Sequence, residues 1–80
     1  MRVQVKLYSI FRLPIQNYDA QRGIEVELPP ESRLTDLFDQ LKIEMRKISM
    51  VRINGNLSRD YCYILKDGDM VELFPLFGGG

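Results

Sequence analysis

Alternation between apolar and polar residues near both ends of the 80-residue chain is the feature that most constrains its fold. Residues 2–8 and residues 70–74 each place valine or leucine at every second position, which is the pattern of a strand with one buried face. Because the final strand needs a firm neighbour in the middle of the sheet, we expect these two strands to lie side by side and parallel. In the final strand, the alternation places Val71 and Leu73 on one face and Met70, Glu72 and Phe74 on the other.

A second alternating run begins after Gly23 and covers residues 24–28. It should form an antiparallel hairpin with the first strand, across a long loop at residues 9–22 into which the first strand could continue as far as Phe11. Two consecutive prolines at positions 29 and 30 end this run, because proline has no N–H to donate to a neighbouring strand.

One amphipathic helix is expected after the two prolines. Its apolar residues recur at spacings of three and four, as one buried face of a helix requires. Ser32 is the best-placed N-cap, with Arg33 and Thr35 as alternatives, and Arg46 and Lys47 near the predicted end match the sign of the helix dipole. The apolar stripe consists of Leu34, Leu37, Phe38, Leu41, Met45 and Ile48.

The segment between the helix and the final strand is dense in turn signals. Residues 50–54 read as a short strand, and Asn54-Gly55 predicts a tight turn after it. Residues 61–65 should be irregular or a brief strand, and residues 66–69 a turn in which Gly68 takes a positive φ. The expected fold class is therefore α+β, a mixed four- to five-stranded sheet with one main helix packed on one face.

Charge and composition exclude several functions. Eleven basic and eleven acidic residues are interspersed, so the chain offers no positive field for nucleic acid. It contains no run of about 18 apolar residues that could span a membrane, and its first residues lack the apolar segment of a secretory signal. We expect a cytoplasmic protein with neither nucleic acid nor membrane as a partner.

A resident catalytic centre is also not expected. Cys62 is the only cysteine and there is no histidine, so an internal disulfide, a Cys-His pair and the usual zinc or iron ligand sets cannot be formed. We therefore expect no bound metal or cofactor and no enzyme activity of its own. We expect Cys62 itself to be an ordinary packed or half-exposed thiol.

The last three residues, Gly78, Gly79 and Gly80, are all glycine. Glycine loses more backbone entropy on ordering than any other residue and offers no side chain to pack, so we expect residues 1–77 to form the domain and residues 78–80 a flexible tail. The chemistry left to such a tail is its terminal carboxylate, which a thin arm could carry into the narrow active site of a partner.

Four residues lead from the final strand to the glycines: Phe74, Pro75, Leu76 and Phe77. Aromatic anchors are typical of the centre of a protein interface, so this apolar segment is a candidate docking surface for the partner, and some of it could instead fold back on the sheet. Pro75 is expected to stiffen the arm and to keep it out of any strand ladder.

Taken together, these motifs resemble the ubiquitin-like β-grasp sulfur carriers. The resemblance covers nearly the whole chain and rests on the sequences VQVKLY, IEVEL, LTDLFDQL, RINGN and LKDGDMVELFP and on the closing Gly79-Gly80. It is closest to the small subunit of molybdopterin synthase, with the thiamine-pathway sulfur carrier next. The third glycine, Gly78, and the first loop depart from the family pattern, so no role is assigned to Arg12 in that loop.

The resemblance implies a mechanism and two partners. In that family, a ubiquitin-activating-enzyme-like adenylyltransferase uses ATP to adenylate the carboxylate of the last glycine, which is then converted to a thiocarboxylate that donates sulfur. Gly80 would carry the reacting group, and Gly78 and Gly79 would thread the partner's active site. The catalytic residues would lie on a larger synthase subunit, most plausibly in molybdenum or tungsten cofactor biosynthesis.

Two other functions remain open from the sequence. The chain could be a ubiquitin-like modifier that is conjugated to lysines of other proteins through Gly80, since this function begins with the same activation. It could also be a β-grasp interaction domain whose glycine tail has no function.

Overall fold

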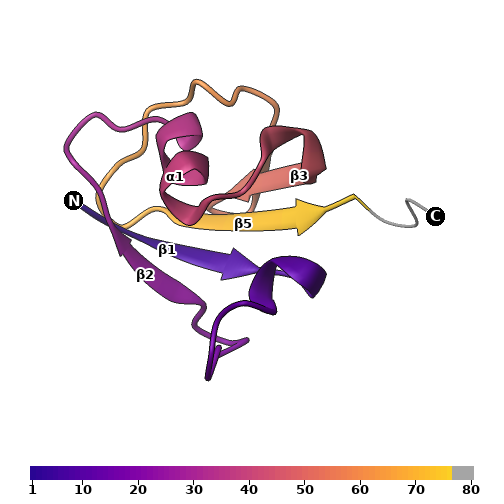
Figure 1. Ribbon diagram of the computed structural model, residues 1–80. Coiled ribbons are helices and arrows are strands. Elements are labelled where there is room, and N and C mark those ends of the chain that lie inside the picture. The colour runs from indigo at the N-terminus through magenta and orange to yellow at the C-terminus, as the bar shows by residue number, and fades with distance from the viewer. Residues whose placement is uncertain (77–80) are drawn as a thin grey trace.

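The computed structural model describes residues 1–76, so Phe77 and the predicted tail at residues 78–80 lie outside the described residues. Figure 1 shows one sheet with a single α-helix across it. The elements in chain order are β1 (Arg2–Leu7), the 3-10 helix η1 (Ser9–Arg12), β2 (Ile24–Glu27), α1 (Leu34–Leu41), the 3-10 helix η2 (Met45–Lys47), β3 (Ile48–Ile53), β4 (Asn56–Ser58) and β5 (Met70–Pro75).

The sheet has five strands in the order β2-β1-β5-β3-β4. The predicted central pair is confirmed: β1 and β5 are parallel, with Val5 opposite Val71 and Leu7 opposite Leu73. The predicted β1–β2 hairpin is confirmed as well, with Val3 opposite Val26. Because β1 and β3 flank β5 on its two sides, the strand that leads to the predicted tail is held along both edges.

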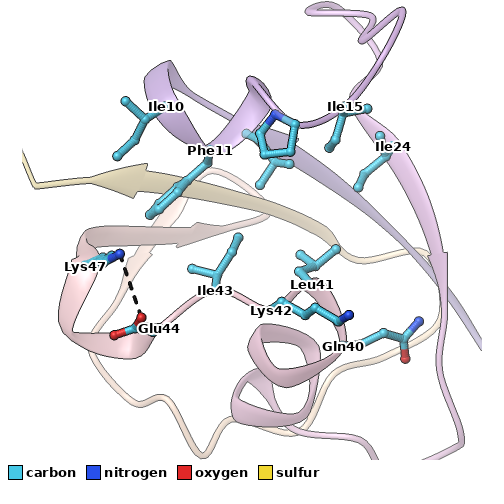
Figure 2. Close-up of a pocket in the computed structure, with 12 residues that line it drawn as sticks. Ile10, Phe11, Ile15, Ile24, Gln40, Leu41, Lys42, Ile43, Glu44 and Lys47 are labelled. Carbon is cyan, nitrogen blue, oxygen red and sulfur yellow. Dashed lines mark ion pairs between the residues drawn. The ribbon is translucent and has the colours of Figure 1, made fainter.

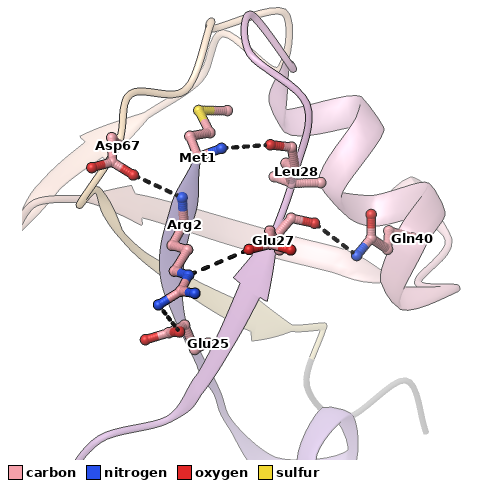
Figure 3. Close-up of polar contacts among 7 residues, drawn as sticks. All are labelled: Met1, Arg2, Glu25, Glu27, Leu28, Gln40 and Asp67. Atoms are coloured by element: carbon pink, nitrogen blue, oxygen red, sulfur yellow. Dashed lines mark hydrogen bonds and ion pairs between the residues drawn. The ribbon is translucent and has the colours of Figure 1, made fainter.

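Polar contacts fix the start of β1 at the end of the sheet where β5 also begins (Figure 3). The amino group of Met1 donates to the Leu28 carbonyl oxygen at 2.8 Å, and the Arg2 backbone N–H donates to Asp67 Oδ1 at 2.8 Å. The Arg2 guanidinium also lies 3.6 Å from Glu25 and 3.4 Å from Glu27. These exposed ion pairs add little stability, and the two backbone contacts do more to hold the strand in place.

The core lies between the sheet and α1. Leu34, Leu37 and Phe38 of the helix are almost completely buried against the strands, as the stripe predicted. The strand residues that meet them are Val3, Val5, Leu7, Val26, Ile48, Val51, Ile53, Val71 and Leu73. One apolar helix face over one apolar sheet face therefore forms the interior.

The helix is shorter than its stripe predicted, because it ends at Leu41. Lys42 takes a left-handed conformation with φ 58°, and the N–H groups of Lys42 and Ile43 donate back to Asp39 and Phe38, as in a Schellman motif. Met45 and Ile48 therefore do not extend the helix. The first lies in η2, and the second begins β3.

The N-cap and the first loop also differ from the prediction. The Ser32 hydroxyl donates to the Pro29 carbonyl instead of capping α1, and Arg33 is the cap residue, whose N–H donates to the Asp36 carboxylate at 2.8 Å. The first loop contains η1 in place of a continued strand. Within residues 1–76, no helix is long and apolar enough to cross a membrane.

A fourth strand, which the sequence did not predict, lies at one edge of the sheet. Asn54 and Gly55 both have positive φ, 52° and 85°, and this predicted turn leads into β4, which pairs with β3. Residues 61–65 are irregular, as one of the two predictions had it, with an isolated bridge between Arg33 and Ile64. Backbone hydrogen bonds also tie them to the start of α1, where the Leu34 N–H donates to the Tyr63 carbonyl oxygen at 3.0 Å. The predicted turn before β5 is confirmed, with Gly68 at φ 86°.

Candidate functional site: the end of β5

The candidate site is the end of β5, from which the predicted tail continues. Val71 and Leu73 are fully buried on the helix side of this strand, and Glu72 and Phe74 face the side of the sheet that the helix leaves open. Phe77, Gly78, Gly79 and Gly80, which the sequence assigns to the site, lie outside the described residues. The structure therefore describes the base of the predicted arm.

Phe74 is half-buried on the open face of the sheet. Its ring stacks on Tyr8 of the segment after β1, with ring centroids 4.4 Å apart and planes 6° apart. The Arg52 guanidinium lies over the Phe74 ring, 5.5 Å from its centre. A predicted docking residue is thus present at the surface, but neighbours fix its orientation.

Glu72 connects the same two neighbours. Arg52 donates to its two carboxylate oxygens at 3.1 Å each, and the Tyr8 hydroxyl donates to Oε2 at 2.6 Å. Burial alone would raise the pKa of Glu72, but the hydrogen bonds from Arg52 and Tyr8 outweigh it and hold this pKa below its usual value. The same contacts raise the pKa of Tyr8 to about 12, chiefly through its hydrogen bond to Glu72, and raise the pKa of Arg52.

We call Tyr8, Arg52, Glu72 and Phe74 the open-face cluster. The sequence predicted only that Glu72 and Phe74 share a face. Tyr8 and Arg52 were missed because their proximity depends on the registers between strands, which place Arg52 directly opposite Glu72. These polar groups satisfy one another, and the cluster thereby fixes the position of Phe74 at the surface.

Pro75 is where the structure departs most from the expected site. Instead of staying out of the ladder it is the last residue of β5, opposite Ile48, and its side chain is almost fully buried. It therefore cannot present its ring to a partner. Leu76 follows it and is 57% exposed, and its N–H donates to the Lys47 carbonyl oxygen at 3.0 Å.

An apolar groove of about 500 Å³ lies beside this point. Figure 2 shows residues of the first loop, such as Phe11 and Ile15, facing Leu41 and Ile43 from the end of α1 and the segment after it. Lys47, whose ammonium lies 3.7 Å from Glu44, lines the end of the groove nearest to Leu76. The base of the predicted arm thus lies between the groove and the open-face cluster.

Cys62, the single thiol, is exposed and is not part of this arrangement. Its backbone N–H donates to the Asp60 carboxylate at 3.0 Å.

Comparison with known proteins identifies a family whose sequences resemble this chain. The sequence profile of the ThiS family matches residues 13–80, which includes the three glycines. No curated protein matches the chain.

Solved structures share the fold over nearly the whole chain. A Pyrococcus furiosus protein described as molybdopterin converting factor subunit 1 is 26% identical, with a TM-score of 0.66 over 94% of this chain and 97% of that one. SAMP1 from Haloferax volcanii is 20% identical, with a TM-score of 0.70 over the full length of both chains. A complex of subunits 1 and 2 of the molybdopterin-converting factor from Helicobacter pylori contains a chain that is 22% identical, with a TM-score of 0.59 over the full length of both.

Proposed function

The chain belongs to the ThiS family of ubiquitin-like sulfur carriers, and from this premise we propose that Gly80 is the residue that carries the sulfur. The observation that carries the proposal is that the family match extends through Gly78, Gly79 and Gly80. In this proposal the folded domain binds the partners, while the arm delivers the reacting group to their active sites.

The proposed reaction has two steps. A carboxylate is a poor electrophile, so the carboxylate of Gly80 first attacks the α-phosphate of ATP on an adenylyltransferase resembling the ubiquitin-activating enzymes, and pyrophosphate leaves. Hydrosulfide then attacks the carbonyl carbon of the acyl-adenylate, AMP leaves, and loss of the S–H proton gives the thiocarboxylate. ATP is bound by the partner, and this chain supplies the carboxylate and the absence of side chains at Gly78 and Gly79 that a narrow active site requires.

Molybdopterin biosynthesis is the pathway we propose, with the thiamine pathway as the alternative. The likeness to the Pyrococcus furiosus protein, whose description names a molybdopterin converting factor, supports this choice. The final Phe74-Pro75 before the arm also looks more like the molybdopterin branch. In this role the chain would be a non-catalytic small subunit, and a larger synthase subunit would contribute the catalytic residues.

The surface around the end of β5 is the proposed partner interface. Phe74 presents an aromatic edge beside Arg52, a combination that is typical of the centre of interfaces, and Leu76 is exposed next to it. Phe77 would extend the same apolar surface. Pro75 contributes by its buried position in the strand and not by direct contact.

Mass spectrometry tests the proposal directly. The chain is incubated with the adenylyltransferase from the same organism, ATP and a sulfide source, and we expect its mass to rise by the replacement of one oxygen by sulfur. A variant that lacks Gly80 is the control and should gain nothing. If the full chain is not loaded under conditions in which the adenylyltransferase consumes ATP with it, the sulfur-carrier proposal is wrong.

Conjugation through Gly80 would give a different result. In cell extracts, a ladder of adducts of higher mass that disappears when Gly80 is removed would favour a modifier. If the loaded chain instead converts the molybdopterin precursor in the presence of a larger synthase subunit, the proposed pathway is supported over the thiamine pathway.

A further inference from the structure

The pairing of β3 with β5 contains one irregularity, and it lies where the predicted arm begins. Met50 is opposite Phe74 and Ile48 is opposite Pro75, so the register shifts and Ser49 is an extra residue on β3. Extra residues of this kind bend a strand locally and often lie beside functional sites. Here the irregularity faces the last two residues of β5.

The Ser49 side chain adds a hydrogen bond to β5 at the point where Pro75 weakens the ladder. Proline has no backbone N–H, so the ladder loses one donor at this position. The Ser49 hydroxyl lies 2.9 Å from the Pro75 carbonyl oxygen and 3.2 Å from that of Phe74, and it donates to this pair of acceptors. The strand is then held once more beyond the proline by the Leu76 N–H, which donates to Lys47 at 3.0 Å.

These contacts hold the end of β5 from one side, and the Tyr8–Phe74 stack holds it from the open face. Pro75 itself is buried and has a fixed φ. The positions of Phe74, Pro75 and Leu76 are therefore set by residues of β3 and of the segment before it.

We propose that Ser49 is a positioning residue that holds Phe74, Pro75 and Leu76, the base of the arm, so that this segment is already ordered when Gly80 enters the partner's active site. This inference rests on the proposed function and deepens it. Without the hydroxyl, the chain from Phe74 to Leu76 would fray, and the partner would have to order it again before each reaction.

Two variants and one control test the proposal. Ser49→Ala removes the hydroxyl, and Ser49→Thr keeps it. Because Ser49 is exposed, neither change opens a cavity in the core. Ser58→Ala is the matched control, since the Ser58 hydroxyl lies on the edge strand β4 and contacts only the nearby Asp60 carbonyl, at 3.4 Å.

The hydrogen-exchange rate of the Leu76 amide tests the proposal without any partner protein. We expect the Leu76 amide to exchange about fivefold faster in Ser49→Ala than in the wild type, the factor expected for the loss of one hydrogen bond, and at the wild-type rate in Ser49→Thr and Ser58→Ala. An unchanged Leu76 exchange rate in Ser49→Ala would overturn the proposal, whether or not the chain carries sulfur.

Sulfur loading by the adenylyltransferase gives the second reading. With Ser49→Ala we expect kcat to fall about fivefold while KM stays near the wild-type value, because the open-face cluster that docks the partner is intact, and we expect Ser49→Thr to restore kcat. If Ser49 only stabilised the fold, Ser49→Ala would lower Tm and leave kcat unchanged well below Tm, and this result would contradict the positioning role. Failure of the wild type to be loaded would count against the proposed function instead.

Discussion

At the scale of single residues, the open-face cluster shows how the side of the sheet without a helix is stabilised. Glu72 is only 8% exposed, and a buried carboxylate is costly unless it is paired and hydrogen-bonded. Arg52 and Tyr8 provide those partners, and the aromatic pair covers them. The residue next to the proposed interface is thus held by a polar network as well as by packing.

Removing the Tyr8 hydroxyl should lower the free energy of unfolding at neutral pH and have little effect at strongly alkaline pH. The folded-state pKa of about 12 lies above the unfolded value of about 10, so the network stabilises the fold fully below about pH 10 and is lost as the pH rises toward 12. Tyr8→Phe should therefore cost about 1 kcal/mol at neutral pH and much less near pH 12. Urea unfolding of both proteins at several pH values measures the difference.

The informative quantity is the difference in unfolding free energy between the two proteins, because the other effects of alkaline pH are common to both of them. A gap in unfolding free energy that stays constant from neutral to strongly alkaline pH would show that the Tyr8–Glu72 hydrogen bond does not stabilise the fold.

At the scale of elements, the early end of α1 explains the main error of the sequence prediction. The spacing of Met45 and Ile48 continues the helical stripe, yet Lys42 turns the backbone into the left-handed region and Ile43 closes the Schellman motif on Phe38. Lysine is an uncommon residue at such a position, which glycine usually occupies. The sequence therefore carried no stop signal, and packing of Ile43 and Ile48 decides where the helix ends.

Lys42→Gly should stabilise the protein. Glycine adopts a positive φ without the steric cost that a Cβ imposes, so we expect a gain of about 0.5–1 kcal/mol in the free energy of unfolding. Gln40→Gly, two residues earlier and inside the helix, is the control and should lose about 1 kcal/mol or more, because glycine disfavours a helix interior and the Gln40 amide no longer donates to the Glu27 carbonyl oxygen. Denaturant unfolding compares the two variants, and equal losses in both would mean that the left-handed turn at Lys42 does not form.

At the scale of the whole molecule, patterns that repeat along the chain were sufficient for the architecture. Alternation at both ends predicted the two strands that lie parallel at the centre of the sheet, and the helical stripe predicted which face of α1 is buried. Strand β4 was missed because its three residues, Asn56–Ser58, are too few to show alternation. Proline's missing donor argued against Pro75 in the ladder, and the Ser49 hydroxyl, which donates to the Pro75 carbonyl oxygen, could only be seen in the structure.

At this scale, the residues that fold the protein are distinct from those proposed to carry out its function. Within residues 1–76, the buried apolar side chains lie between Val3 and Pro75, so a chain without residues 78–80 keeps all of these contacts. We expect this truncated chain to have the Tm of the full chain within measurement error and to lose sulfur loading completely.

Leu73→Ala is the contrasting variant, since truncating this fully buried leucine should cost about 2–5 kcal/mol and lower Tm, while any molecules that remain folded still carry Gly80. Thermal unfolding together with mass spectrometry after loading compares the two, and a truncated chain that still supports its pathway would refute the carrier function.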